Sequence, residues 1–348
     1  MARPRWFSVR QELTPKRGRM LGVLAFVLPL ALWSLFSYIP WLWHPMVRVT
    51  DPGDVDWMRA GLLIDRHDFD KEVASAHDAH THAPVGFRAN PIYFPAPHAV
   101  GRALYTAFTT APVLKGDLWL HESLWMSIQT IFWGFTISSI IGIPLGILCG
   151  SFIAISRLTE PFVDFVRYMP APAFGALMVA IFGIQLEPKI AIIVIGTFFQ
   201  QVLVVANTVR KVDGALIEAA QTLGSKRRQL VLRVIVPASL PDLYNDTRIL
   251  LGWAWTYLIV AEVVGVSSGI SFFINQQAKY RNFDNVYAAI LIIGVLGLTI
   301  DQILAFIGKR LFPWKNPRAS RIRAFLGKLF GLRPPGTPAP KPPQLLST

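Results

Sequence analysis

The sequence predicts an all-α membrane protein with six transmembrane helices, both termini in the cytoplasm and a helical cytoplasmic loop between the fourth and fifth spans. Three observations support this fold class. Only 16% of the 348 residues are charged, whereas soluble domains average about 25%. The charged residues are missing from long windows, as they are in membrane helices. Lysine and arginine are concentrated in a few segments between these windows, which is typical of cytoplasmic loops.

Six windows are long and apolar enough to cross a bilayer, which takes roughly 20 residues of helix. The first two windows contain no charged residue, and three of the other four carry one or two ionisable residues. The expected spans, in chain order, are 20–43, 124–152, 161–182, 190–208, 247–266 and 286–307.

The first window is predicted to be an uncleaved span rather than a secretory signal peptide. Its apolar run exceeds the roughly 7–15 residues usual in a signal peptide, and no cleavage site of small residues follows it. The chain continues instead with Trp41 and Trp43, and tryptophan is enriched at the membrane–water interface.

The distribution of basic residues predicts the orientation. The N-terminal tail has six basic residues and one acid, the 210–240 loop has six basic residues, and the chain from Lys309 onward has nine basic residues and no acid. The segment 44–121 has seven basic residues against nine acids. Because basic loops stay on the cytoplasmic side, we expect this segment to face outward. The predicted parts are a cytoplasmic tail (1–19), the first span (20–43), a periplasmic insertion with an amphipathic segment (44–121), a five-helix core (122–312) and a second cytoplasmic tail (313–348).

The net charge of +13 invites comparison with nucleic-acid-binding proteins. However, the charge lies in the predicted cytoplasmic loops, where it fixes topology and contacts anionic lipid head groups. The sequence also lacks a basic patch interleaved with aromatic residues, which single-strand binders use. We therefore expect lipid contacts and no nucleic-acid partner. The single cysteine, Cys149, excludes an internal disulfide framework.

The segment 213–237 is predicted to form two short helices joined by a turn. Asp213 suits an N-cap, and the first helix has one apolar face with small residues at its centre. Gly224 permits a sharp exit from the first helix. Ser225 is expected to cap the second helix, and Pro237 is expected to end it. The apolar face consists of Leu216, Ala219, Ala220 and Leu223.

The same segment resembles the EAA loop of ABC importer permeases, whose pattern is E-A-A-x3-G-x9-I-x-L-P. The matching positions are Glu218, Ala219, Ala220, Gly224 and Pro237, with valine in place of the family's isoleucine and leucine. In that family the loop forms a coupling helix that docks in a groove of the ATPase subunit. The resemblance therefore implies that these five residues couple the membrane domain to a separate ATPase.

Further short matches resemble the nitrate, sulfonate and taurine branch of this family over about residues 93–312. They include Phe94-Pro95-Ala96-Pro97 before the amphipathic helix and Ala261-Glu262 in the fifth span. The resemblance implies a multi-pass subunit of the bacterial inner membrane that imports a small anionic solute, such as nitrate, a sulfonate or taurine. The long polar insertion 45–92 departs from the family pattern, so the identity of the solute stays open.

The resemblance also implies the partners. The chain contains no G-x4-G-K-[ST] phosphate loop, so no cofactor is expected in it, and ATP and Mg²⁺ are expected in a partner ATPase dimer. Since one chain carries one coupling loop, we expect two permease chains, as a homodimer, and a periplasmic solute-binding protein. The alternative is a secondary transporter or channel that works without ATP. A membrane enzyme is not expected, because no catalytic cluster lies within or beside the spans.

All seven histidines lie between His44 and His121. His77, His80 and His82 are close in sequence, and imidazole is the commonest metal ligand near neutral pH. Two of them at alternate positions of an extended segment could share a metal, but a solvated polar loop explains the same residues. We therefore predict no metal site and keep these three as the weaker alternative.

Three ionisable residues within the spans are candidates for function, because charges are costly inside a membrane. Arg248 and Glu262 lie fourteen residues apart in the fifth span, about 21 Å along a helix, so they cannot pair with each other. Asp301 lies in the sixth span. Pairing between helices is the favoured interpretation, and contact with the solute pathway is the alternative.

Overall fold

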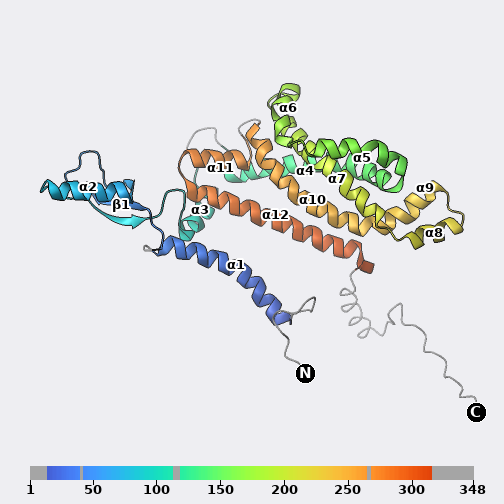
Figure 1. Ribbon diagram of the computed structural model, residues 1–348, viewed down its shortest axis with the longest axis horizontal. Helices are drawn as coiled ribbons and strands as arrows, with labels where there is room; N and C mark the ends of the chain where they lie inside the picture. Colours follow the sequence, from blue (N-terminus) through green and yellow to red (C-terminus); the bar gives the residue numbers. More distant parts are fainter. Residues whose placement is uncertain (1–13, 40–41, 113–117, 265–267, 316–348) are drawn as a thin grey trace, which may run out of the picture. The chain divides into compact units, whose positions relative to one another are not determined.

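The computed structural model describes residues 14–39, 42–112, 118–264 and 268–315. These residues are mostly helical. The chain divides into two compact units, which are described separately below. The first comprises Met1–Met126 and Ser268–Ile293, and the second comprises Ser127–Ser267 and Gly294–Thr348. Figure 1 shows the elements of both units.

In the first unit, the predicted first span is the helix α1, Pro15–Tyr38. Aromatic contacts near the end of α1 join it to other parts of the unit. Tyr38 stacks on His98 of α3, Pro97–Thr109, with ring centroids 5.7 Å apart. Trp33 stacks on Tyr287 with ring centroids 5.8 Å apart, and its Nε1 donates to the carbonyl of Pro95 at 3.2 Å. The same unit contains α11 (Ile270–Lys279) and the beginnings of α4 (Leu120–Ser151) and α12 (Phe283–Leu311).

The insertion folds into a small α/β structure, so the prediction of an all-α chain with a polar loop here is wrong. A three-stranded antiparallel sheet has the order β2-β1-β3, and α2 follows β2 directly. The side chain of Asp65 caps α2 by accepting from the backbone N–H of His67. The elements are β1 (Met46–Asp51), β2 (Leu63–Asp65), α2 (Arg66–Asp78) and β3 (Val85–Ala89).

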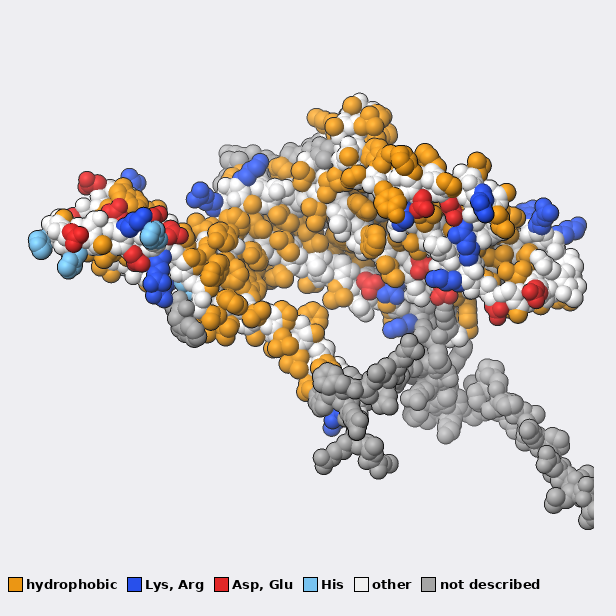
Figure 2. Space-filling view, in the orientation of Figure 1, with side chains coloured by type: hydrophobic (Ala, Val, Ile, Leu, Met, Phe, Trp, Pro, Cys, Tyr) orange, Lys and Arg blue, Asp and Glu red, His pale blue; other side chains and the backbone are white. Residues whose placement is uncertain are grey.

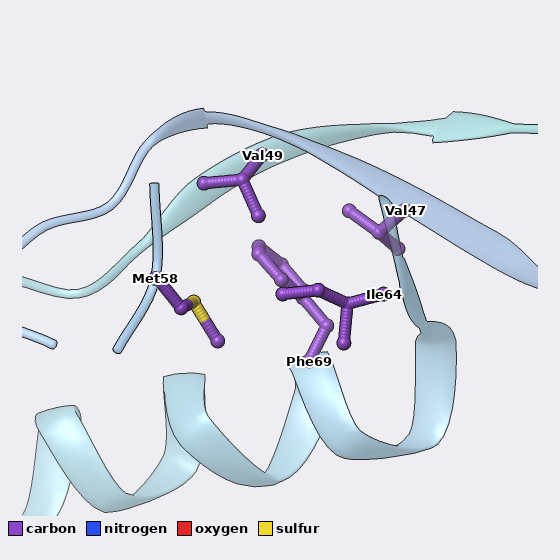
Figure 3. Packing of buried hydrophobic residues seen from close by; sticks show 5 residues of the cluster. All are labelled: Val47, Val49, Met58, Ile64 and Phe69. Atoms are coloured by element: carbon purple, nitrogen blue, oxygen red, sulfur yellow. The ribbon is translucent and has the colours of Figure 1, made fainter. Parts of the chain in front are cut away.

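The strand β1 alternates buried and exposed side chains. Val47 and Val49 point inward, whereas Arg48 between them is exposed, as expected for a strand with one covered face. The inward side chains pack on Phe69 of α2, as Figure 3 shows. The polar composition of the segment concealed this core, because a strand of six residues contributes only two or three buried side chains. The buried cluster is Val47, Val49, Met58, Ile64 and Phe69.

The second unit contains the remaining long helices and the loop between the fourth and fifth predicted spans. The helix α4 enters it from the first unit, and α12 ends in it. Its other elements are α5 (Ile153–Arg167), η1 (Ala171–Phe174), α6 (Gly175–Phe182), α7 (Glu187–Arg210), α8 (Gly214–Thr222), α9 (Arg227–Leu230), η2 (Val231–Ile235), α10 (Val236–Val264) and η3 (Pro313–Lys315).

Glycines on α4 allow α7 to approach very closely, as their spacing of four residues predicts. A Cβ on Gly146 would lie 2.6 Å from Cβ of Val205, and one on Gly150 would lie 2.6 Å from Cβ of Val209. Gly142 is less constrained, since the nearest atom to its added Cβ would be 3.3 Å away. The α4–α7 contact therefore requires glycine at two of the three positions.

Four helices of the described residues are long and apolar enough to cross a membrane: α1, α4, α7 and α12. The helices α5 and α6 together would supply a fifth span, bent by 85°. The 29-residue helix α10 covers the predicted fifth span but is not among the helices that meet this test. Figure 2 shows hydrophobic side chains over the surface of the long helices. The coarse prediction of a helical membrane protein is confirmed, and the count of six spans stays a prediction.

Candidate functional site

The predicted coupling segment begins with a well-defined short helix, α8. The carboxylate of Asp213 caps it by accepting from the backbone N–H of Ala215 at 3.0 Å. At its other end, the N–H of Ser225 donates to the carbonyl of Ala220 at 3.1 Å. Gly224 lies in this turn with φ of +78°, a conformation that costs other residues free energy. The glycine is therefore required by the backbone rather than by crowding, since an added Cβ would meet open space.

Most of the predicted docking face of α8 is exposed. Leu216 is 50% exposed and Leu223 is 87% exposed. Glu218 and Ala219 are also exposed. Ala220 is different, because it is buried at 9% exposure. The helix thus presents two leucines and one small residue outward, while Ala220 packs against the rest of the chain.

The second half of the segment corrects two details of the sequence prediction. The helix α9 begins at Arg227, and its N-cap is Lys226 rather than Ser225. The side chain of Gln229 accepts from the backbone N–H of Lys226 at 3.0 Å, which satisfies the helix start without a serine cap.

Pro237 does not end this helix. The π-helix η2 connects α9 directly to α10, which contains Pro237. The N–H of Val236 donates to the carbonyl of Val231, five residues back. This wider turn comes immediately before the proline, where a regular α-helix would bring the proline ring against a carbonyl. The coupling segment is therefore continuous with the fifth predicted span.

A hydrophobic cluster fixes the segment to the long helices. Val231 and Ile235 of η2 are buried against Val205 and Val209 of α7 and Leu243 of α10. These are the two residues of α7 that make the closest contacts with glycines of α4. A displacement of the loop therefore acts directly on the packing of α4, α7 and α10, because close-packed interiors transmit strain.

Polar contacts join the end of α7 to α5 and α10. The guanidinium of Arg210 pairs with the carboxylate of Glu160 on α5 and donates to Oγ of Ser156 at 3.0 Å. Two residues earlier, the hydroxyl of Thr208 donates to the carboxylate of Asp246 on α10. Sequence reasoning missed these residues, because their partners lie 38 to 54 positions away.

The ionisable residues within the predicted spans make contacts between helices. Arg248 of α10 forms a two-pronged pair with Asp301 of α12, with Nη2 2.8 Å from Oδ1 and 3.0 Å from Oδ2. Glu262 of α10 accepts from the hydroxyl of Ser127 on α4. Lys189 of α7 is also buried, and it interacts electrostatically with Glu262. Both Lys189 and Glu262 are only 2% exposed. Lys189 escaped the sequence reasoning because it lies at the edge of its apolar window.

The three clustered histidines are exposed and are not in one extended segment. His77 lies in the last turn of α2, and His80 lies in the following turn with φ of +54°. The extended arrangement that the weaker metal-binding alternative requires is therefore absent at His80. Within the ranges that the structure describes, no group of three or more His, Cys, Asp or Glu side chains is placed to hold a metal ion.

Comparison with known proteins assigns the family. Residues 142–313 match the family described as binding-protein-dependent transport system inner membrane component. A probable ABC transporter permease of Brucella abortus is 34% identical over 59% of this chain and 81% of its own length. The taurine transport system permease of Escherichia coli is 30% identical over 65% and 81%. A putative aliphatic sulfonates transport permease of Bacillus subtilis is 33% identical over 59% and 73%. The chain therefore belongs to the binding-protein-dependent transport system inner membrane components, among the ABC transporter permeases of the nitrate, sulfonate and taurine type.

Proposed function

We propose that this permease is coupled to a separate ATPase through the exposed face of α8. The observation that carries the proposal is the contrast between the two halves of the segment. Leu216 and Leu223 are exposed, although burial of a leucine side chain is worth about 1.5–3 kcal/mol. The second half of the segment is held on α7 and α10 through the buried Val231 and Ile235 of η2. A movement of the ATPase at the exposed face of α8 would therefore displace η2 and, through it, α7 and α10.

The partners follow from the family. An ATPase dimer would supply ATP hydrolysis, and a solute-binding protein would deliver the solute on the opposite side. Because each chain contributes one α8, two copies of this chain would fill the two grooves of the ATPase dimer. The solute is proposed to be a small anion, in keeping with the relatives named for taurine and aliphatic sulfonates.

The proposed topology places α8 in the cytoplasm and the insertion outside the inner membrane. Single cysteines in a Cys149→Ser background test this placement. In intact cells, a membrane-impermeant maleimide should label His77→Cys but should label Leu223→Cys only after permeabilisation. Equal labelling of both variants in intact cells would contradict the topology.

Co-purification tests the docking face directly. Replacing Leu223 with glutamate should release the ATPase from detergent-solubilised complexes, because it places a charge on the proposed contact. Leu232→Glu is the matched control, since Leu232 is a 54% exposed leucine of the neighbouring element η2. If both variants retain the ATPase, or both lose it equally, the assignment of docking to α8 fails.

The ATP-independent alternative makes the opposite prediction for transport. Vesicles that contain the permease without an ATPase should then accumulate solute. On the proposed function, accumulation requires the ATPase, ATP and the binding protein together.

A further inference from the structure

A pocket of about 240 Å³ lies in the first unit, and none of the described residues that line it has a charged side chain. It is slightly smaller than the roughly 300–1,000 Å³ of most ligand pockets, so it suits a molecule of few heavy atoms. Its walls come from the end of α3, the beginning of α4, α11 and the beginning of α12. Its polar lining consists of Thr106, Thr110, Trp119, Gln276, Gln277, Asn282 and Asn285.

Gln277 is the distinctive side chain of this pocket. It lines the cavity although the residue is only 9% exposed. Nδ2 of Asn282 donates to its Oε1 at 3.2 Å, and Nδ2 of Asn285 donates to the same oxygen at 3.0 Å. Two donors therefore hold the oxygen, and the hydrogen-bond capacity that remains on this amide is the NH₂ group. Within the described residues, that NH₂ group has no hydrogen-bond acceptor.

The neighbouring amide is engaged differently. Nε2 of Gln276 donates to the hydroxyl of Tyr280 at 3.4 Å. Helix dipoles do not decide the preference of the pocket, because α3 and α11 end at it while α4 and α12 begin at it. The NH₂ group of Gln277, whose side-chain oxygen is already engaged, is therefore one fixed donor that the described lining offers to a ligand. A donor in a partly desolvated pocket favours an oxyanion, because hydrogen bonds to a charged group are stronger than neutral ones.

We propose that this pocket binds the oxyanion group of a small solute, such as a sulfonate, carboxylate or nitrate, through the NH₂ group of Gln277. The inference rests on the proposed function, in which the beginnings of α4 and α12 lie on the outward side. The pocket is then an entry subsite where solute contacts the permease before it passes between the spans. A cationic solute is disfavoured, since the described residues of the lining include no carboxylate.

The test uses the complete permease–ATPase complex in lipid nanodiscs, with methanesulfonate as the probe. Saturation-transfer NMR on the methyl protons of the probe measures binding, and methylammonium serves as the cationic comparison. Wild-type complex should bind methanesulfonate and not methylammonium. Gln277→Glu should weaken methanesulfonate binding at least tenfold, because it removes the donor and adds a repelling charge.

Gln277→Glu separates ligand binding from a structural role, because the carboxylate keeps an acceptor for Asn282 and Asn285. Thr109→Glu is the matched control. Thr109 is an exposed residue of α3 that bonds only within its own helix and does not line the pocket. The control should bind methanesulfonate like wild type. If the glutamate variant misfolds, the neutral Gln277→Met variant takes its place, with the same expected loss.

Three results would overturn the proposal: no methanesulfonate binding by wild type, equal binding by wild type and Gln277→Glu, or preferential binding of methylammonium. The ATPase should co-purify with Gln277→Glu as it does with wild type. If the expected methanesulfonate binding is not found while the ATPase still co-purifies, this inference is refuted and the docking proposal is not. If the Leu223→Glu and Leu232→Glu variants lose the ATPase alike, the docking proposal is refuted. The measurement of methanesulfonate binding by the wild-type complex does not depend on that result.

Discussion

Gly146→Ala is predicted to destabilise the contact between α4 and α7. The added methyl carbon would lie 2.6 Å from Cβ and 2.7 Å from Cγ1 of Val205, and 2.8 Å from the carbonyl oxygen of Val202. Carbon atoms in favourable contact are about 3.5–4.0 Å apart. The two helices must therefore separate by roughly 1 Å, because two of the three nearest atoms are a branched Cβ and a backbone oxygen that cannot rotate away.

Overpacking of this kind costs about 1–3 kcal/mol. Alanine also gains up to about 1 kcal/mol over glycine in a helix interior, which partly hides the cost. Gly252→Ala in α10 supplies the correction, because no atom lies within 4 Å of its added Cβ. The propensity gain is common to both variants, so their difference in free energy of unfolding should be the steric cost, about 1–3 kcal/mol.

Equilibrium unfolding of the purified chain in mixed micelles measures this difference. Since Val205 also belongs to the cluster that holds η2, Gly146→Ala should additionally reduce the stimulation of the ATPase by solute-loaded binding protein. The reasoning is refuted if Gly146→Ala and Gly252→Ala are equally stable. It is also refuted if Gly146→Ala is the more stable of the two.

Three further predictions concern single side chains. Replacing Arg248 or Asp301 singly with leucine should destabilise the chain more than replacing both. The coupling energy in a double-mutant cycle should be about 1 kcal/mol, because the pair is partly exposed. Additive effects of the two single replacements would contradict the pairing. Gly224→Ala should cost about 1–2 kcal/mol because of the positive φ at this position, so the affinity for the ATPase should fall by up to roughly 30-fold. Gly224→Asn should cost less. Equal ATPase affinity of wild type and both variants would disprove a role for the left-handed turn. Zinc affinity of the purified chain, measured by calorimetry, should not change when alanine replaces His77, His80 and His82, and a clear loss would revive the metal hypothesis.

The segment 213–237 shows which structural features can be predicted from local sequence. The cap at Asp213 and the turn at Gly224 were predictable, because each depends on the chemistry of one residue and its immediate neighbours. The continuation through Pro237 was not predictable in the same way. A proline normally interrupts a helix, and here the preceding π-turn removes the conflict. The π-turn is stabilised by the burial of Val231 and Ile235 against helices that are distant in sequence.

The insertion shows the opposite case. Its composition is polar, and its histidines attract attention, yet its structure depends on a few alternating residues such as Val47 and Val49. Short strands bury too few side chains to stand out from a loop in one sequence. Only the pairing of β1 with both neighbouring strands makes the pattern visible.

The sequence alone determined that the chain is a helical membrane protein and predicted two short helices in 213–237, because membrane spans, charged loops and helix caps are properties of contiguous residues. Tertiary structure decided which polar groups meet. Glu262 contacts Ser127 across 135 positions, Arg248 contacts Asp301 across 53, and Gln277 is fixed beside a pocket by a neighbouring helix start. Such contacts depend on how helices pack against one another, and a one-dimensional pattern does not encode that arrangement in any local feature.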